Sequence, residues 1–248
     1  MNWQGTSLPH RKISSPNINE RRGDQSISIL LLHYTGMTSA AKSCHWLCTP
    51  ESQVSCHYLI DEHGAITQMV DEKMRAWHAG DGSWCGAEDV NSRSIGIEIH
   101  NPGHTHGYSD FPKVQMNAVV QLGKDIVTRH KIPPRNVLAH SDIAPARKID
   151  PGEKFDWRYL HDHGLGHWVS PEPISGGSFL QQGDQGDAVF ALQSLLKLYG
   201  YGIQIDGKYG AETHLVTAAF QRHFRQSKVD GVADQSTVAT LHKLLRPL

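Results

Sequence analysis

The amino-acid sequence predicts an α/β domain, with a mixed β-sheet flanked by helices, followed by a small all-α domain of three helices. The first observation behind this prediction is the almost unbroken Ile and Leu run of Ile27–Thr35, which is typical of a strand buried on both faces. The second is a change to helical periodicity over Lys113–His130, where Val119, Leu122 and Ile126 recur at three- and four-residue steps. The third is a Pro-, Gly-, Ser- and Gln-rich stretch, after which the pattern is wholly helical.

The other elements of the first domain follow from shorter patterns. In Ser94–His100 the isoleucines occupy one face of a predicted strand, and Gly96 and Glu98 occupy the other. Alternation of such strands with helices is what indicates an α/β domain. We expect, in addition, a helix at Ser39–Leu47, strands at Cys56–Ile60 and Ile66–Val70 joined by a turn over 61–64, a last strand at Val137–His140 and a short helix at Phe155–His161.

Composition divides the chain into four parts. We expect a polar N-terminal arm (1–26), the α/β domain (27–170), a linker (171–183) and the helical domain (184–248). The helical domain contains a short internal repeat, in which the turns Asp206-Gly207 and Asp230-Gly231 each precede a helix cap and a helix. This spacing is also compatible with a generic three-helix bundle.

Bulk composition excludes some classes of partner. The formal net charge is -1, from 24 basic and 25 acidic residues, so no global attraction to nucleic acid or to an anionic membrane is expected. No apolar run reaches the ~20 residues of a membrane-spanning helix. The N-terminal residues lack the apolar core of a secretory signal, which points to the cytoplasm, with a periplasmic or outer-membrane-associated location as the alternative. The 17 histidines favour a metal site.

The four cysteines are Cys44, Cys48, Cys56 and Cys85, all in the first third of the chain. They do not form two spaced Cys-x-x-Cys pairs, so a structural zinc ribbon is not indicated. Cys44 and Cys48 can share one face of a helix. Free thiols are favoured, and a disulfide or a cysteine metal site is the alternative.

Three residues that can bind a metal lie at or after the ends of predicted strands. His33 ends the first buried strand, His140 ends the strand Val137–His140, and Asp150 follows ten residues later. Two histidines and one carboxylate leave the fourth tetrahedral position of a zinc ion open, as a hydrolytic site requires. Taken singly, each residue has an ordinary structural explanation, because a histidine at a strand end is more often structural than a ligand.

Four ordered segments resemble the type 2 N-acetylmuramoyl-L-alanine amidases, a family of AmiD/AmpD-like zinc amidases. These segments are LLHYT (31–35), WHAG (77–80), SIGIEIHN (94–101) and VLAHSDIAPARKIDPG (137–152). The resemblance covers about Ile27 to Trp168 and looks closest to the AmiD branch, because the last segment and the appended domain both fit. The tail resembles the peptidoglycan-binding domain type 1 through DGKYGAET, AAFQRHF and the second Asp-Gly turn.

The resemblance implies a role for five residues, and the sequence departs from the family at none of them. His33, His140 and Asp150 match the ligands of a Zn²⁺ cofactor. Glu98 matches the general base that takes a proton from the zinc-bound water, and its place on the polar face of its strand allows it to face a cleft. Lys148 matches the group that stabilises the oxyanion, a contribution of about 10²–10³ in rate by analogy with single oxyanion-hole donors.

Substrate contacts are expected from Trp77, His78 and Arg147, because an aromatic and a basic side chain suit a sugar ring and the carboxylates of a peptide stem. Ordinary packing and an ion pair are the alternatives. The loop 100–106 contains three histidines and is expected to line the cleft, with a second metal site as the alternative. His57 is expected to pack near the zinc and not to bind it.

The resemblance implies hydrolysis of the amide bond between N-acetylmuramic acid and L-alanine, in peptidoglycan or in muropeptides. A wall-binding tail raises the local concentration of substrate and therefore favours polymeric glycan. Two rivals stay open: a non-catalytic peptidoglycan receptor on the same fold, and a metallopeptidase that cuts within the stem peptide. The sequence does not decide whether 1,6-anhydro sugars are required, which stem peptides are accepted, or the oligomeric state.

Overall fold

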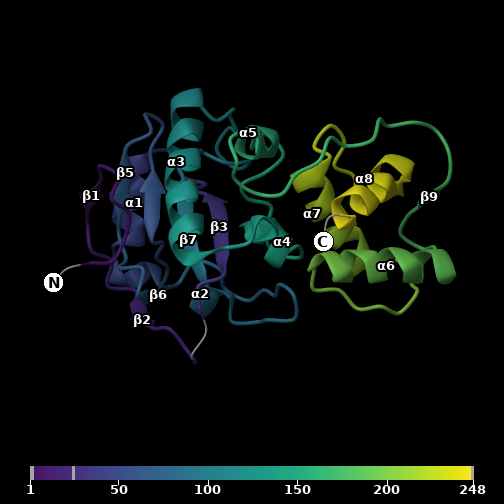
Figure 1. The fold of residues 1–248 in the computed structure, drawn as a ribbon, viewed down its shortest axis with the longest axis horizontal. Coiled ribbons are helices and arrows are strands. Elements are labelled where there is room, and N and C mark those ends of the chain that lie inside the picture. Colours follow the sequence, from purple (N-terminus) through teal and green to yellow (C-terminus); the bar gives the residue numbers. More distant parts are fainter. Residues whose placement is uncertain (1–2, 24–25, 247–248) are drawn as a thin grey trace.

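The computed structural model describes residues 3–23 and 26–246. Residues 1–2 and 24–25 of the predicted arm, and residues 247–248 of the predicted helical domain, therefore lie outside the described residues. A mixed α/β part and a helical part lie side by side, with the short helices α4 (His140–Ile143) and α5 (Trp157–Asp162) near their boundary (Figure 1). The predicted fold class is confirmed.

A six-stranded mixed sheet forms the centre of the α/β part. Its strand order is β1-β5-β4-β7-β3-β8. Neighbouring strands are parallel except β4 and β5, which form the predicted antiparallel hairpin. The strands are β1 (Arg11–Lys12), β3 (Ile29–Tyr34), β4 (Tyr58–Ile60), β5 (Ile66–Gln68), β7 (Ser94–Ile99) and β8 (Val137–Ala139).

Helix α3 (Lys113–His130) covers one face of this sheet, with the bounds that the sequence predicts. Leu30 and Leu32 of β3 share a buried cluster with Val119 and Leu122 of the helix. The three isoleucines of β7 belong to the same cluster, so the predicted division of that strand into two faces is confirmed. Gly96 and Glu98 consequently lie on the face away from α3.

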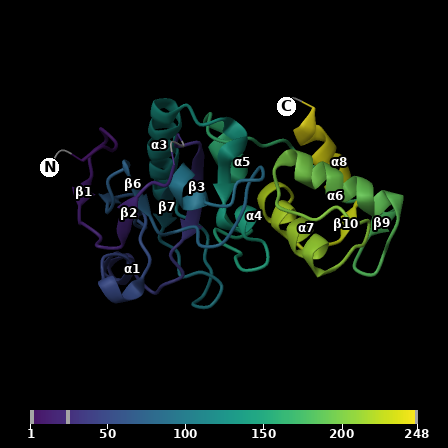
Figure 2. The ribbon, with the colours of Figure 1, turned by 90° about the horizontal axis from the view of Figure 1, so that it is seen from below.

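The opposite face is covered at its two ends by different helices (Figure 2). At one end lies α1 (Ala40–Leu47), which begins at Ser39, whose side chain accepts a hydrogen bond from the backbone of Lys42. At the other end, Ile29 and Leu31 of β3 pack in one cluster with residues of the C-terminal helices. The carboxyl end of β3 thus lies between the two covers, and the predicted site residues lie there.

The N-terminal residues form part of the sheet edge and do not behave as a separate polar arm. β1 pairs with β5, and β2 (Ile18–Glu20) forms a separate antiparallel ladder with β6 (Met74–Ala76). Arg21 then donates hydrogen bonds to backbone carbonyls of Glu72, Asn91, Ser92 and Ser94. Backbone pairing of polar residues leaves little periodicity in the sequence, which is why the pattern suggested only an arm.

Short helices connect the larger elements, and one of them corrects a prediction. His140 does not end a strand; it begins α4, because the side chain of Asp142 accepts a hydrogen bond from the backbone N–H of Ala139 and closes a helical turn. The helix predicted at 155–161 is α5. The other short helices are α2 (Val90–Arg93) and the 3₁₀ turns η1 (Pro50–Ser52) and η2 (Pro134–Asn136).

The C-terminal part contains the three predicted helices, α6 (Asp187–Tyr199), α7 (Ala211–Phe224) and α8 (Gln235–Leu245). It is not wholly helical, because β9 (Phe179–Leu180), from the expected linker, pairs with β10 (Ala233–Asp234). The internal repeat has a structural counterpart. Gln193 accepts hydrogen bonds from the backbone of the first Asp-Gly turn, and Gln221 does the same for the second.

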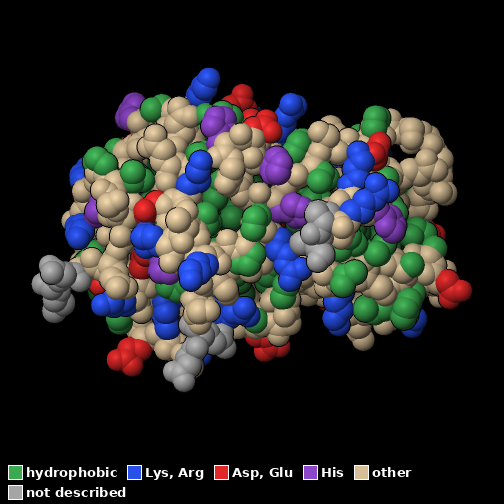
Figure 3. Space-filling view, viewed as in Figure 1, with side chains coloured by type: hydrophobic (Ala, Val, Ile, Leu, Met, Phe, Trp, Pro, Cys, Tyr) green, Lys and Arg blue, Asp and Glu red, His purple; other side chains and the backbone are tan. Residues whose placement is uncertain are grey.

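The surface is continuous where the two parts meet, and histidine side chains lie near this boundary on the face shown in Figure 3. Within the described residues, no helix combines the length and the apolar character that crossing a bilayer requires.

Candidate metal centre

His33, His140 and Asp150 converge at the carboxyl end of β3. Their side chains are almost inaccessible, with 1%, 3% and 7% of each residue exposed. The two Nδ1 atoms lie 2.9 Å apart, and each lies 3.1 Å from Oδ2 of Asp150. Strand β3, helix α4 and the loop after α4 therefore bring together the three residues that the sequence predicts as ligands.

The outward nitrogen of His33 is fixed by a chain of hydrogen bonds. The hydroxyl of Ser94 donates to the carbonyl of Val90 at 2.7 Å, so its oxygen is left to accept from Nε2 of His78 at 3.2 Å. Nδ1 of His78 then carries no proton and accepts from Nε2 of His33 at 3.0 Å. A neutral His33 protonated on Nε2 has a free lone pair on Nδ1, which points into the cluster.

His140 is oriented in the same way. Its Nε2 lies 2.9 Å from the carbonyl oxygen of Ala79, which only accepts, so this nitrogen donates. In the neutral ring, Nδ1 of His140 is therefore also unprotonated. Two nitrogen lone pairs and a carboxylate oxygen then face one another without a proton between them. That arrangement is repulsive by itself and fits a divalent cation of the kind that nitrogen and oxygen donors bind.

The acid–base properties agree with this arrangement. Burial, followed by the neighbouring His140, lowers the pKa of His33 to about 4, so its ring is neutral near pH 7. Burial, followed by the nearby histidines, also lowers the pKa of His78 well below its usual value.

Glu98 lies beside the cluster. It pairs in register with His33 on the neighbouring strand, so the two side chains share one face of the sheet. Its Oε2 atom is buried and has no hydrogen-bond partner among the described residues. Burial and the charge of Asp150 raise the pKa of Glu98 well above its usual value, whereas Lys148 acts in the opposite direction. Glu98 is thus a carboxyl group with an unused acceptor next to the three candidate ligands.

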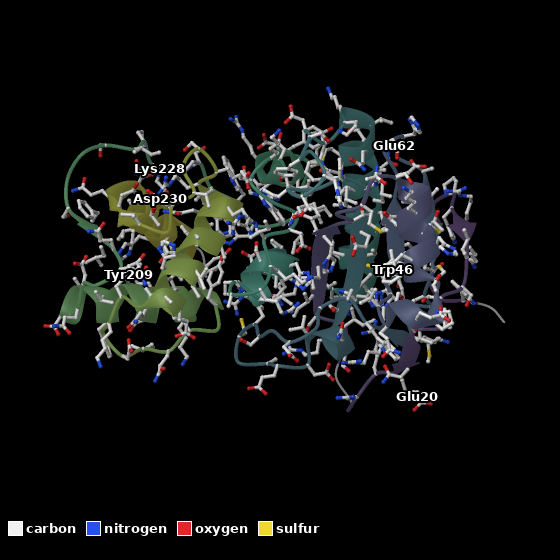
Figure 4. The ribbon with its side chains drawn as sticks, turned by 180° about the vertical axis from the view of Figure 1, so that it is seen from behind. Glu20, Trp46, Glu62, Tyr209, Lys228 and Asp230 are labelled. Carbon is white, nitrogen blue, oxygen red and sulfur yellow. The ribbon has the colours of Figure 1, made fainter. Side chains whose placement is uncertain are left out.

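A cleft of about 460 Å³ opens onto the three ligands, Glu98 and Lys148. Its lining includes five apolar side chains that the sequence analysis did not single out, which are Met37, Trp46, Leu47, Val54 and Ile149. Trp46 is 46% exposed and lies over the α/β part when the molecule is seen from behind (Figure 4). A hollow of about 650 Å³ beside α1 is larger, but none of the three ligands lines it.

The three residues expected to contact substrate line this cleft in different ways. Trp77 is partly exposed, and its indole N–H donates to the side chain of Asn19. Arg147 donates to the backbone carbonyls of Ala79 and Asp81. His78 is buried behind His33 and supports it. Substrate contact stays a prediction for all three, although the hydrogen bonds of His78 favour a supporting role.

The other histidines and the cysteines are placed outside the ligand set. Thr105 of the loop 100–106 lines the cleft, and His104 of that loop bonds Glu153. The candidate ligand set is the sole group of three metal-competent side chains found in the described part of the chain.

His57 packs against His78 and accepts from the backbone of Gly96, as expected of a residue that is not a ligand. The four cysteines are free thiols.

Supporting residues were not visible in the sequence. Asn91 accepts from the backbone N–H groups of His78 and Ala79 and so holds the loop that orients both histidine ligands. Gly96 leaves room for His78, because a Cβ atom there would lie 2.6 Å from Nδ1 of that ring. Contacts of this kind join distant segments and carry no periodic signal.

Replacing Gly96 by alanine is expected to weaken metal binding about 10–100-fold, the usual cost of losing an outer-shell partner, because the added methyl group displaces His78 from His33. Competition with a chromophoric chelator measures this affinity. Ile97→Val, on the same strand but facing α3, is the control; it should cost about 0.5–1.5 kcal/mol of stability and leave metal binding unchanged. If Gly96→Ala and the wild type bound the metal with equal affinity, His78 would not be a residue that supports the metal centre.

Known protein families match both parts of the chain. The N-acetylmuramoyl-L-alanine amidase family matches residues 23–153, and the peptidoglycan binding domain family matches residues 185–241. N-acetylmuramoyl-L-alanine amidase AmiD of Escherichia coli K12 is 37% identical over 235 residues, which is 88% of this chain and 82% of that protein. 1,6-anhydro-N-acetylmuramyl-L-alanine amidase AmpD of Haemophilus influenzae is 34% identical over 60% of this chain and 90% of its own length.

A solved structure of the same family has a fold similar to that of this chain. The complex of AmiD from E. coli with the substrate anhydro-N-acetylmuramic acid-L-Ala-D-gamma-Glu-L-Lys has a TM-score of 0.78 and 35% identity, and the match covers 92% of both chains. The similarity of fold therefore includes the α/β part and the C-terminal helices together. With two family matches in sequence order and relatives similar over most of their length, the chain belongs to the N-acetylmuramoyl-L-alanine amidase family.

Proposed function

We propose that this amidase works with Zn²⁺ held by His33, His140 and Asp150, and that it hydrolyses the bond between N-acetylmuramic acid and L-alanine in both peptidoglycan and muropeptides. The observation that carries the proposal is the convergence of the two histidine Nδ1 atoms, which lie 2.9 Å apart, on one oxygen of Asp150, which lies 3.1 Å from each of them. When bound there, zinc supplies a water activated near neutral pH and polarises the amide carbonyl.

The protein residues divide the remaining chemistry between them. Glu98 accepts the proton of the attacking water through its unpaired carboxyl oxygen and returns it to the departing nitrogen of L-alanine. Lys148 lines the same cleft and stabilises the negative charge that develops on the carbonyl oxygen. Burial lowers the pKa of His33 and of His78, so both rings are neutral near pH 7 and the Nδ1 lone pair of His33 stays available to the metal.

Substrate is proposed to lie along the cleft between α1 and the loop that contains Arg147. Trp77 and the exposed Trp46 offer ring faces to a sugar or to the apolar parts of the stem. The substrate of the AmiD complex and the anhydromuramic pentapeptide in a structure of AmpDh3 from Pseudomonas aeruginosa are both muropeptides. They support the same class of substrate for this chain.

Product analysis tests the function. The zinc-loaded protein is incubated with purified sacculi and, separately, with anhydro-muropeptides, and the products are identified by mass spectrometry. We expect free stem peptides that begin with L-alanine, and glycan that keeps its lactyl carboxylate. A cut between two residues of the stem would support a metallopeptidase, and metal-bound protein without any product would support a receptor. Both results would overturn the proposal.

The comparison of sacculi with anhydro-muropeptides also tests in which cellular compartment the protein works. Intact wall lies outside the cytoplasm, so efficient release from sacculi favours the periplasmic or outer-membrane-associated location. Activity restricted to the small fragments favours the cytoplasm. The C-terminal domain supports wall as a substrate, because tethering to glycan raises the local concentration of cleavable bonds.

A further inference from the structure

The C-terminal part is built into the fold of the α/β part. One buried cluster contains Leu31 of β3 and Leu138 of β8 together with Leu196, Tyr199 and Phe220 of the C-terminal helices. Trp84, from a loop of the α/β part, is 1% exposed and packs edge-on against two C-terminal tyrosines. The two parts thus share a core, which a domain that acts only as a tethered wall binder does not require.

One carboxylate in this shared region connects the C-terminal part to α4. Asp142 has no exposed surface. Its Oδ1 accepts from the hydroxyl of Tyr201 at 2.8 Å, and its Oδ2 accepts from Nδ1 of His223 at 2.7 Å. Oδ2 also accepts from the backbone N–H of Ala139 at 2.8 Å. Both side-chain donors come from the C-terminal part, and the backbone donor immediately precedes a metal ligand.

The turn that Asp142 closes carries one ligand and holds another. His140 is its first residue. The backbone N–H of Ser141 donates to the carbonyl oxygen of Asp150 at 3.1 Å. Two of the three metal ligands are therefore fixed by one short turn, whose position depends on where the Asp142 carboxylate is held.

His223 is held in turn by its neighbours. Its ring stacks between Trp157, with centroids 3.7 Å apart, and Phe224, with centroids 3.9 Å apart. Only 2% of the residue is exposed. Packing therefore fixes the direction in which Nδ1 points, as expected of a donor that has to reach one carboxylate oxygen.

We propose that Tyr201 and His223 of the C-terminal part are positioning residues for the metal centre, acting through Asp142 on His140 and Asp150. The inference rests on the proposed metal site and adds a second role for the peptidoglycan-binding domain, which is to hold the turn that carries His140. Neither residue lines the cleft, and the side chain of each hydrogen-bonds Asp142, so both act through the turn.

The test separates the hydrogen bonds from the packing. Tyr201→Phe removes one donor to Asp142, and His223→Phe removes the other while keeping a ring between Trp157 and Phe224. Tyr199→Phe is the matched control, because that buried tyrosine lies in the same interface and its hydroxyl bonds His167 instead. His223→Asn is the rescue variant, because its amide N–H₂ lies about where Nδ1 of histidine does.

Three quantities are measured on the full-length proteins: zinc affinity by chelator competition, the visible absorption spectrum of the Co²⁺-loaded form, and the Tm of the metal-free form. We expect Tyr201→Phe and His223→Phe each to bind zinc about 10-fold or more weakly and to have an altered Co²⁺ spectrum. Tyr199→Phe should keep wild-type affinity and spectrum. His223→Asn should have a lower Tm than His223→Phe, because it loses the stacking, and yet bind zinc more tightly.

Wild-type affinity and an unchanged Co²⁺ spectrum in Tyr201→Phe and His223→Phe would overturn the inference. It would equally be overturned if Tyr199→Phe lost as much affinity as they do, because general loosening of the interface would then be the cause. Failure of the wild type itself to bind zinc would instead contradict the proposed metal site, so the two failures are distinguishable.

Discussion

Replacing Asp150 by alanine is expected to remove metal binding and amidase activity together. Oδ2 of Asp150 lies 3.1 Å from Nδ1 of His33 and of His140, and Asp150 is the one carboxylate among the three proposed ligands. Loss of an outer-shell partner alone weakens metal binding about 10–100-fold, so loss of a direct ligand should exceed that. Metal content after dialysis and the rate of product release measure the two losses on the same sample.

The control for this variant is Asp156→Ala, in the segment that follows. Asp156 is exposed and caps α5 by accepting from the backbone of Tyr159, so its removal should cost about 1 kcal/mol of stability without affecting the metal. An Asp150→Ala protein that retains metal at the wild-type level would show that this residue is not a ligand.

Glu98→Gln is expected to separate binding from turnover. Glutamine has nearly the same shape as glutamate but cannot accept the proton of the attacking water. The variant should keep its metal, because Glu98 makes no hydrogen bond to the three ligands, and kcat should fall about 10²–10⁴-fold, the usual contribution of a general acid–base group. Steady-state kinetics with a muropeptide, alongside metal analysis, gives both quantities.

Glu62→Gln provides the comparison, since Glu62 lies in the turn between β4 and β5 and does not line the catalytic cleft. It should have wild-type kinetics. Near-normal turnover in metal-loaded Glu98→Gln would show that Glu98 is not the general base. Loss of metal in that variant would mean that the residue supports the ligands and does not serve as the base.

The local spacing of apolar residues in the sequence was sufficient to predict the larger helices and strands. The isoleucines of β7 face α3, and α3 itself has the predicted bounds, because burial of one face of a strand or helix leaves a periodic signal in the sequence. The side of β7 on which Glu98 lies follows from the same alternation. The grouping of His33, His140 and Asp150 needed the family resemblance, since no local pattern relates residues more than 100 positions apart.

What could not be predicted depends on contacts between distant segments. His140 begins a helix because Asp142 caps it, and Asp142 is held by residues of the C-terminal part. The order of the N-terminal residues likewise results from the hydrogen bonds that Arg21 donates to the carbonyl of Glu72, in the turn before β6, and to that of Asn91 in α2. The position of His78 behind His33 depends on the space that Gly96 leaves.

The central claim is that two histidines and one aspartate hold a single divalent ion with one position left open. An anomalous difference map from crystals of the zinc-loaded protein, recorded at the zinc absorption edge, tests it directly. We predict one peak at about 2.0–2.2 Å from Nδ1 of His33, Nδ1 of His140 and an oxygen of Asp150, with no fourth protein ligand. A map without a peak between these three side chains, or with a fourth side chain completing the shell, would contradict the account.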